Sequence, residues 1–474
     1  MTKNIFTIPL DDSIPGPGPY PLTVQIFTDK DLTQEVGSAS TELVITTPSP
    51  TPAAVVKLGA YIELWQYRNT DATYPYSVNS GWNPVVRAAN VSANALALID
   101  HFYLLAGVQL NGNDSKLYFG NPAGLPPAAL VLNVAGTDWN TNTGSAQGTY
   151  VDPSNPDYTY SAWALKNTIA YMANQSVNRN NFLLSVGGYL LSDTMDLAGS
   201  SPAQAATAAS QIVTLMTLCG AKGVDMDYEP VGIPCNPGRI STLMGAVYNA
   251  VKAVNPSYEV HLTLIPSILQ SDPDQKIASA VACVDYVDQL NVMTYDDPST
   301  LGQAPYQPGS IPIYNHTGVD RSVQSVQWFI DAGFPASKMG MGIAAYARNS
   351  ASPSAAFNPQ NPVPYSQIVD SADGAGQPTN SFPLGRYSGT ANIQNPAPTG
   401  PGDYYAPLAT AIWGFDSVDT IESKVQNAST MGLRAVFMWQ ISNDYANTAS
   451  PHPAGNPRAN FALLSAARNA IQSL

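Results

Sequence analysis

The sequence has few of the residues that build covalent or metal-linked frameworks. Its 474 residues include three cysteines, Cys219, Cys235 and Cys283, and four histidines. Three cysteines do not make a disulfide framework, and their spacing matches no zinc pattern, so we expect them to pack in the core. The histidines are scattered along the chain and give a metal site little to build on. We therefore predict no metal and no cofactor.

Charged side chains are also scarce, at 11% of the chain, and the formal net charge is -14. Nucleic acids and anionic membranes both demand clustered Lys and Arg, so we expect neither as a partner. A neutral polymer fits this composition better. The 25 tyrosines and 7 tryptophans supply amphipathic rings that suit the faces of sugar rings, although half-buried tyrosines would give the same count.

Long hydrophobic runs are missing as well. The most apolar stretch, residues 95–110, is broken by Asp100 and His101, so no segment is suited to span a bilayer. The N-terminus does not resemble a signal peptide, because the apolar run at residues 5–10 is short and acidic residues follow it. For an exported protein, either a signal has been removed or export uses another route.

Clusters of proline and glycine divide the chain into modules. Two expected strands, at residues 22–27 and 41–46, lie between such clusters and predict a small β module over residues 1–47. A Pro/Thr/Ser stretch at residues 48–54 predicts an extended linker, and the main domain is expected over residues 55–474. Composition leaves open whether the β module holds carbohydrate, packs on the main domain or acts as a spacer.

From residue 55 onward, apolar runs suited to strands buried on both faces alternate with helical patterns. Eight such runs favour an α/β fold, a closed (β/α)8 TIM barrel, over an open sheet. The runs cover residues 55–64, 95–105, 181–188, 223–229, 259–265, 286–295, 339–346 and 433–441, with helices expected at 161–173, 203–218, 240–254 and 321–332. Residues 349–411, rich in Pro, Gly, Asn and Ser, are too long for an ordinary loop and predict an inserted subdomain between the seventh and eighth strands.

An acidic stretch within the fourth of these runs is the best candidate for chemistry. Successive strand residues face opposite sides, so Asp225, Asp227 and Glu229 share one face, with Cα atoms about 6.6 Å apart. Ionising one such carboxyl raises the cost of ionising the next, and a carboxyl that stays neutral can protonate a glycosidic oxygen. Solvated strand faces and sites for calcium or magnesium also carry alternating acids. The position at the end of a barrel strand favours catalysis.

These residues resemble the signature of glycoside hydrolase family 18, the chitinase family, which reads Asp-Gly-x-Asp-x-Asp-x-Glu. Gly223, Asp225, Asp227 and Glu229 match it, while Lys222 replaces the first Asp. Further segments are similar to family motifs in the family's order, at residues 185–188, 293–296, 342–348, 413–416 and 432–439.

The resemblance implies a role for each acid. Glu229 is expected to protonate the glycosidic oxygen while the substrate's own N-acetyl oxygen attacks C1, so that no protein nucleophile is needed. Asp227 is expected to orient the acetamide, Asp225 to hold Asp227 and share protons, and Tyr295 to bind the acetamide oxygen. The expected substrate-binding residues are Trp439, which would form the floor under the reacting sugar, with Tyr61, Ser185, Met293, Asp296 and Arg348.

On this resemblance the chain is expected to be a secreted, monomeric chitinase that cleaves β-1,4 bonds between N-acetylglucosamine units of chitin or chitooligosaccharides. The insertion at residues 349–411 would then be an α+β subdomain that forms one wall of the cleft. Two alternatives stay open. An endo-β-N-acetylglucosaminidase acting on N-glycans would share the acids, and a chitin-binding lectin on the same scaffold would usually have lost the acid that Glu229 supplies.

Overall fold

The structure is a computed structural model of the chain, and it contains two compact units, Met1–Ala53 and Ala54–Leu474. It describes residues 18–27, 35–45, 56–63, 97–105, 107–119, 129–130, 149–151, 159–161, 181–189, 191–230, 235–265, 273–296, 319–350, 363–365, 404–408, 411–416, 418–444 and 461–474. The first unit holds an antiparallel pair of strands, β1 (Gly18–Phe27) and β2 (Glu35–Ile45), which include most of the two strands expected there. The linker expected at residues 48–54 lies outside the described residues.

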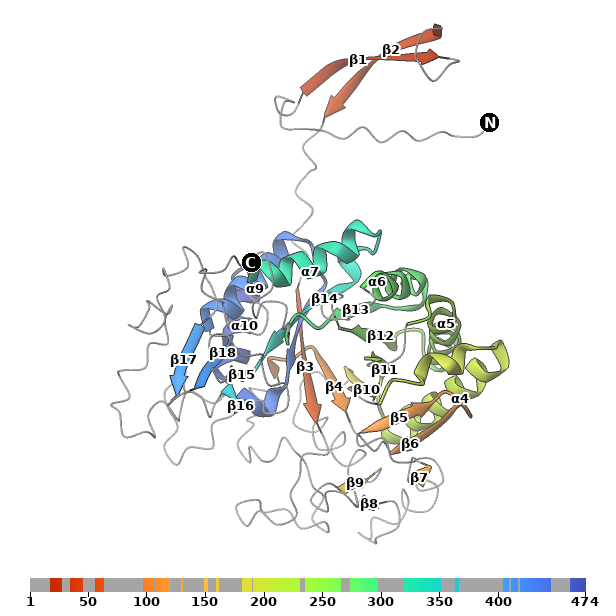
Figure 1. Cartoon of the computed structure of the whole chain (residues 1–474), viewed down its shortest axis with the longest axis vertical. Coiled ribbons are helices and arrows are strands. Elements are labelled where there is room, and N and C mark those ends of the chain that lie inside the picture. Colours follow the sequence, from red (N-terminus) through yellow and green to blue (C-terminus); the bar gives the residue numbers. More distant parts are fainter. Residues whose placement is uncertain are drawn as a thin grey trace. The chain divides into compact units, whose positions relative to one another are not determined.

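The second unit is built around a closed barrel of eight parallel strands (Figure 1), which confirms the predicted TIM barrel. The strands are β3 (Lys57–Glu63), β4 (His101–Leu105), β10 (Phe182–Gly187), β11 (Gly223–Tyr228), β12 (Glu259–Leu264), β13 (Gln289–Val292), β14 (Met339–Ala344) and β19 (Ala435–Trp439). Pairing of β19 with β3 closes the ring. Each predicted run contains one strand, although β4 begins later than predicted. The Asp100 carboxylate, just before β4, accepts the N–H of Leu58.

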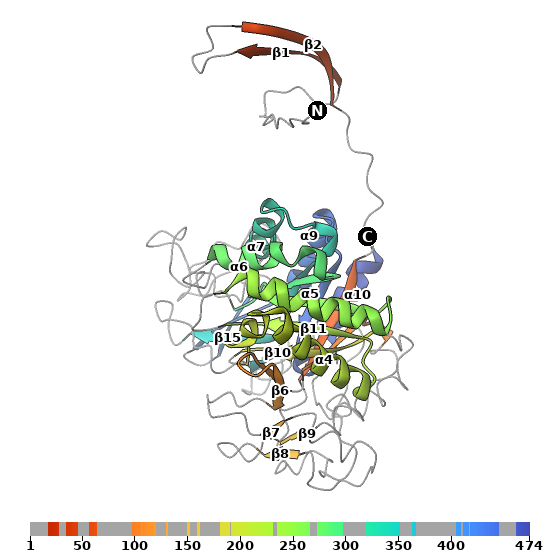
Figure 2. The same ribbon diagram turned by 90° about the vertical axis from the view of Figure 1, so that its right-hand side faces the viewer.

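Helices lie around the outside of the barrel (Figure 1, Figure 2). They are α4 (Pro202–Cys219), α5 (Pro237–Val254), α6 (Pro273–Ala282), α7 (Val319–Asp331), α9 (Val418–Thr430) and α10 (Ala462–Gln472), with short 3-10 turns η2 (Met195–Gly199), η4 (Val284–Tyr286), η6 (Ala336–Lys338) and η8 (Ile441–Asp444). The helices predicted at 203–218, 240–254 and 321–332 are confirmed as α4, α5 and α7. The helix predicted at 161–173 remains. Residues 162–173 lie outside the described residues, and residue 161 ends strand β9. No helix in the described part of the chain has the length and hydropathy of a membrane span.

Local chemistry explains where the helices next to the acidic strand begin and end. Ser201 precedes α4, and its hydroxyl accepts the N–H of Gln204, so a backbone donor at the helix start is satisfied. The helix ends at Gly220, whose φ of 81° suits a residue without a Cβ. Asn236 caps α5 in the same way through the N–H of Arg239. Both helices also carry proline in their first turn, where a missing N–H costs little.

The main core fills the space between the strands and the helices. Val224, Met226 and Tyr228 of β11 belong to this apolar cluster, as their alternation with the acids predicted. Burying each such side chain contributes about 1.5–3 kcal/mol, which holds the strand with its acidic face toward the barrel interior. The three cysteines form no disulfide and are buried, which confirms that they pack.

Smaller sheets follow the barrel strands. After β4 come β5 (Val108–Asn111), β6 (Lys116–Phe119) and β7 (Ala129–Leu130), then the pair β8 (Thr149–Val151) and β9 (Thr159–Ser161). Between β14 and β19 lies an antiparallel sheet of β15 (Tyr346–Ser350), β16 (Val363–Pro364), β17 (Tyr404–Leu408) and β18 (Ala411–Phe415). Most of the insertion expected at residues 349–411 lies outside the described residues, so its α+β character stays a prediction.

Candidate active site

The acidic face of β11 points into the barrel near its C-terminal end. Asp225 and Asp227 lie on the strand and are buried, and Glu229 follows it and is partly buried. Parallel pairing places Asp227 beside Gly187 of β10 on one side and Thr263 of β12 on the other. The three carboxyls therefore stand one above the next at the end where barrel enzymes bind their substrates.

Asp225 is the lowest of the three and is surrounded by hydroxyl groups. Tyr61 and Ser185 each donate to its Oδ2 at 2.8 Å, and Thr263 donates to its Oδ1 at 2.6 Å. Burial raises the pKa of this carboxyl, and the three hydrogen bonds, which favour the charged form, offset part of that rise. Asp225 is thus held as a hydrogen-bond acceptor in a fixed orientation.

Asp227 is harder to ionise than a free carboxyl. Burial raises its pKa well above the usual value, and the charges of Glu229 and Asp225 and a hydrogen bond with Glu229 raise it further. Its Oδ1 is buried and has no hydrogen-bond partner among the described residues. A neutral carboxyl at this position can donate one hydrogen bond and still offers a free acceptor oxygen.

Glu229 is the carboxyl that titrates near neutral pH. Burial raises its pKa to about 7, and the charge of Asp296 adds to the rise, while Lys276 and the hydrogen bond from Asp227 oppose it. Glu229 therefore titrates in the neutral pH range. That is the condition in which a carboxyl works as a general acid.

Two glycines lie at the end of the neighbouring strand β10, beside Asp227. Gly187 and Gly188 have φ values of 109° and 105°, which side-chain-bearing residues rarely adopt. A Cβ at Gly187 would lie 2.2 Å from the carbonyl oxygen of Asp227, and this oxygen accepts hydrogen bonds from the N–H of Gly188 and the hydroxyl of Ser192. The close approach locks the backbone of Asp227.

Aromatic side chains border the acids on the far side of the barrel. Tyr295 is buried, and its hydroxyl has no hydrogen-bond partner in the part of the chain that is described. Gly342 of β14 makes room for its ring, because a Cβ there would lie 2.7 Å from Tyr295 Cε1. Trp439 ends β19, is partly buried, and has its ring 5.1 Å from that of Tyr61. A donor hydroxyl and a partly open indole therefore stand opposite the carboxyls.

A sequence profile of the family described as glycosyl hydrolases family 18 matches residues 60–444, which include the whole barrel except the first residues of β3. The chain belongs to glycosyl hydrolase family 18. The match contains all three carboxyls, Tyr295 and Trp439.

Named relatives of this family-18 chain are chitinases. Chitinase C of Streptomyces lividans is 26% identical over 282 residues, which are 56% of this chain and 42% of that protein, so the match spans less than half of the relative's length. Chitinase 1 of Aphanocladium album is 25% identical over 378 residues, 71% of this chain and 84% of that protein. The solved Group IV chitinase of Ostrinia furnacalis has a TM-score of 0.54 and 16% identity, over 88% of this chain and all of that chain, which shows the shared fold.

The structure buries two expected substrate-binding residues, Tyr61 and Ser185, against Asp225. Tyr61 is fully buried, with its ring stacked on Tyr103 and its hydroxyl on Asp225, so it holds the acid and has no surface to offer a ligand. Met293 is almost fully buried in the apolar cluster inside the barrel. Arg348 lies on β15, where the structure describes the backbone but not the side chain, so its role in binding stays a prediction. Asp296 has a φ of 58° and acts on Glu229 through its charge.

The sequence analysis missed Lys276 of α6. Its side chain is buried, and burial lowers its pKa to about 8, while the charges of Cys235 and Glu229 oppose that shift. Its Nζ has no hydrogen-bond partner among the described residues. The available signal was its spacing: Lys276 lies four residues before the buried Ala280, and residues four apart share one face of a helix. Such a cation beside the acid limits how far the pKa of Glu229 rises.

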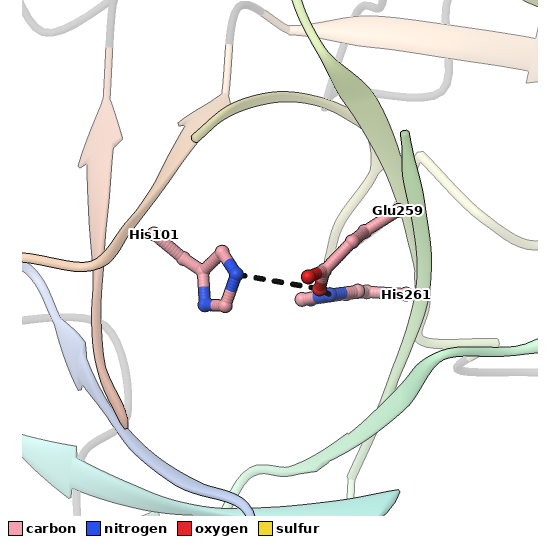
Figure 3. Close-up of side chains that lie close together, drawn as sticks. All are labelled: His101, Glu259 and His261. Carbon is pink, nitrogen blue, oxygen red and sulfur yellow. Dashed lines mark hydrogen bonds and ion pairs between the residues drawn. The ribbon is translucent and has the colours of Figure 1, made fainter. Parts of the chain in front are cut away.

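The expectation that the histidines are scattered was wrong for two of them. His101 and His261 meet at the N-terminal end of the barrel, with their Nε2 atoms 3.3 Å and 2.8 Å from Glu259 Oε2 (Figure 3). The residues are far apart in sequence. Closure of the barrel brings the side chains of β4 and β12 together across its interior. Two imidazoles and a carboxylate are a set that can hold a transition metal. Glu259 is also paired with Arg434 at 2.7 Å and Lys57 at 3.4 Å, and these cations oppose the binding of a further one.

Proposed function

We propose that the chain is a chitinase that hydrolyses β-1,4 bonds between N-acetylglucosamine units by a retaining, substrate-assisted mechanism. Family membership supports glycoside hydrolysis, and the similar chitinases support chitin as the substrate class. The carboxyl whose pKa lies at about 7, Glu229, supports acid catalysis at the end of the barrel. No metal or other cofactor enters this mechanism.

The observation that carries the proposal is a pair of buried polar atoms without partners. Asp227 Oδ1 is an unused acceptor, and the hydroxyl of Tyr295 is an unused donor, within the described residues. Each unpaired buried polar group destabilises the free protein by roughly 1–3 kcal/mol. A ligand that forms hydrogen bonds with both groups removes this cost, which favours its binding. An acetamide has one N–H and one carbonyl oxygen. It would donate to Asp227 and accept from Tyr295.

The reaction then follows from this placement. Glu229 donates its proton to the glycosidic oxygen as the C1–O bond breaks, and the acetamide oxygen attacks C1 to form an oxazolinium ion. Asp227 accepts a hydrogen bond from the N–H of this ion, which carries part of the positive charge, and Asp225 holds Asp227 in place. Water then attacks C1 from the opposite face while Glu229 takes up its proton, which releases the β-anomer. A nucleophile carried by the substrate can lower the activation barrier by about 7–11 kcal/mol through its effective molarity.

The two alternatives share most of these residues and differ in what they predict for an assay. A lectin would bind chitin oligosaccharides without cleaving them, and an endo-β-N-acetylglucosaminidase would cleave high-mannose glycoproteins. The pKa of Glu229 argues against the lectin, because perturbed titrations cluster at catalytic sites. Incubation with chitin oligosaccharides and with a high-mannose glycoprotein separates the three functions.

The mechanism predicts that hydrolysis requires an N-acetyl group at the reacting sugar. Cello-oligosaccharides and fully deacetylated chitosan are expected to be inert, because they carry no internal nucleophile. Partly acetylated chitosan is expected to be cut only where an N-acetylated unit becomes the new reducing end, with the β-anomer formed first. Mass spectrometry of the product ends and proton NMR of the anomers measure both. Glucosamine at new reducing ends, or the α-anomer first, would require another nucleophile and would remove these roles from Asp227 and Tyr295.

A further inference from the structure

A chain of buried hydrogen bonds continues from Asp225 toward the other end of the barrel. Thr263, which donates to Asp225, accepts from Asn291 Nδ2 at 3.1 Å. The Oδ1 of Asn291 in turn accepts from Gln289 Nε2 at 2.7 Å. Asn291 and Gln289 are both on β13 and fully buried, and their side chains point into the barrel beside β12. Three steps thus lead from the acid into the middle of the barrel.

The same amide of Gln289 begins a second branch in the opposite direction. Its Nε2 also donates to the hydroxyl of Tyr103 at 3.1 Å, and that hydroxyl lies 3.0 Å from His261 Nδ1. His261 Nε2 lies 2.8 Å from Glu259 Oε2. The two branches together join Asp225, at the substrate end of the barrel, to Glu259, at the other end.

The chemistry of Glu259 sets the direction of every bond in this branch. Although burial raises its pKa, hydrogen bonds from His101 and His261 lower it far more, so Glu259 is ionised and only accepts. His261 Nε2 must therefore carry the hydrogen. Burial lowers the pKa of His261 to about 4, so the ring is neutral and its Nδ1 accepts. Tyr103 then donates to His261, which leaves the phenol oxygen to accept from Gln289.

Both branches consequently run outward from Gln289 and end on a carboxylate. One N–H of its amide leads through Asn291 and Thr263 to Asp225, and the other leads through Tyr103 and His261 to Glu259. Side-chain amides do not pass protons along, so the chain does not conduct a proton between its ends. It instead fixes the orientation of each hydroxyl and amide.

We propose that this buried chain positions Asp225 and keeps it an ionised acceptor, with the amide of Gln289 as the central positioning residue. The proposal rests on the function proposed above, in which Asp225 holds Asp227. Loss of the Gln289 bond frees the Asn291 amide to turn, Thr263 can then donate to Asn291, and Asp225 loses one of its three donors. A less stabilised carboxylate takes up a proton at higher pH.

The surroundings of Asp225 contain few other groups that could set its ionisation. The titratable groups around it in the described residues are Tyr61 of β3, Tyr103 of β4, Asp227 of its own strand and His261, its register partner on β12, while Glu229 acts through Asp227. The pKa values of both tyrosines are raised, mainly by burial, so each stays a neutral donor. Asp227 is itself hard to ionise, because burial raises its pKa. The hydroxyl donors, and the chain that orients one of them, Thr263, are therefore what favours the charged form of Asp225.

The test compares the pH dependence of kcat/KM for chitohexaose among three variants. Gln289→Met removes both N–H groups at similar volume, and we expect the acidic limb to move to higher pH by at least ~0.5 unit, with the alkaline limb unchanged. Gly340→Ala keeps every polar group but places a Cβ 3.0 Å from Asn291 Oδ1 and 3.2 Å from Gln289 Nε2, and it should shift the same limb by less. Gly340→Ala also tests the proposal by itself if Gln289→Met does not fold.

Leu183→Ala is the control, since Leu183 is buried in the barrel interior and its side chain makes no hydrogen bond. It should lose thermal stability without moving the acidic limb. An acidic limb that stays in place in folded Gln289→Met and Gly340→Ala, or one that moves as far in Leu183→Ala, would overturn the proposal.

A second readout does not depend on activity. Melting temperatures of Asp225→Asn, Gln289→Met and the double variant form a cycle, and the double variant should lose less than the sum of the single losses, because both break the same chain. If the wild-type protein hydrolyses no chitin oligosaccharide, the proposed function fails while this cycle still tests the chain. Additive losses would overturn the chain itself.

Metal addition tests whether Glu259, at the end of the second branch, is a carboxylate that only accepts hydrogen bonds or a metal ligand. The melting temperature should not change with zinc chloride or EDTA, because Arg434 and Lys57 already neutralise Glu259. A rise with zinc that disappears in His101→Gln would make Glu259 and His261 metal ligands, which reverses the direction of the bonds and overturns the proposal.

Discussion

At the scale of single residues, three neighbouring carboxyls behave differently because their surroundings differ. Asp225 accepts from three hydroxyls, burial and two neighbouring acids raise the pKa of Asp227, and burial brings the pKa of Glu229 to about 7. One strand supplies all three. Separate titrations of this kind are how a site obtains an acid and a charge stabiliser from the same chemical group.

The alkaline limb of hydrolysis is expected near pH 7. Glu229 must be protonated to act as the acid, so activity is full well below its pKa of about 7 and declines as the pH rises through that value. The plot of kcat/KM against pH for a soluble chitin oligosaccharide measures this limb. A limb above pH 9 would assign the acid to a different residue.

Glu229→Gln is expected to separate activity from stability. The variant should lose hydrolysis by about three orders of magnitude or more, because the amide cannot donate the proton. Since the folded-state pKa of Glu229 is raised from 4.5 to about 7, its contribution to stability is full below about pH 4.5 and is lost as the pH rises through 7. The variant should therefore be more stable than the wild type at pH 8, by roughly 1–3 kcal/mol, and nearly equal at pH 4. Thermal melts at both pH values measure the difference.

Glu259→Gln is the matched control for that experiment. The pKa of Glu259 is lowered in the folded state, so this carboxylate stabilises the fold above about pH 4.5, and its replacement should destabilise the protein at pH 8. Equal signs for the two variants would contradict the pKa assignments.

At the scale of elements, the strand-end glycines show how little room the site leaves. Gly187 and Gly333 both have positive φ, at 109° and 98°, yet a Cβ at Gly187 meets Asp227 while one at Gly333 meets nothing within 4 Å. Gly333→Ala should cost only the backbone strain, roughly 1–2 kcal/mol, and leave activity intact. Gly187→Ala should cost more and abolish activity, because the backbone of Asp227 must move.

Denaturant unfolding and hydrolysis rates compare these two alanine variants directly. Equal stability losses would mean that the backbone near Asp227 adapts to the added methyl group, and the close approach at Gly187 would then have no part in holding the acid.

Element positions could be predicted where local pattern decides them. The alternation in β11 placed Val224 and Met226 against the helices and Asp225 inside the barrel, because the periodicity of a strand is local. The start of β4 could not be found in this way, since the apolar run begins before it, and the contact between Asp100 and Leu58 of the neighbouring strand β3 has no local signal.

At the scale of the whole molecule, the partners of the acids come from segments that no local signal connects. The family motif pointed to Asp225, but its bond with Tyr61 joins residues 164 positions apart, and His101 meets His261 only because the sheet closes. Lys276 reaches Glu229 from a helix outside the barrel. Contacts of this kind follow from the closed topology, and composition and spacing carry no trace of them.

The second unit is expected to work without the first. Removal of residues 1–53 should leave hydrolysis of soluble oligosaccharides unchanged within about twofold, because all the proposed catalytic residues lie in the unit Ala54–Leu474. Steady-state rates and size-exclusion chromatography of the shortened protein check this. Aggregation of the shortened protein would show that residues 1–53 protect an apolar surface of the barrel.

The pairing of Lys57 in β3 with Ala435 in β19 also has a consequence for synthesis of the protein. At about 5–20 residues per second, a ribosome needs on the order of tens of seconds between these two positions. Until β19 is made, β3 lacks its barrel neighbour on that side, and unpaired strand edges pair readily with other chains. Synthesis is therefore a period that favours misassembly, and a slow translation rate or a high density of ribosomes on one message would lengthen the exposure or bring more such edges together.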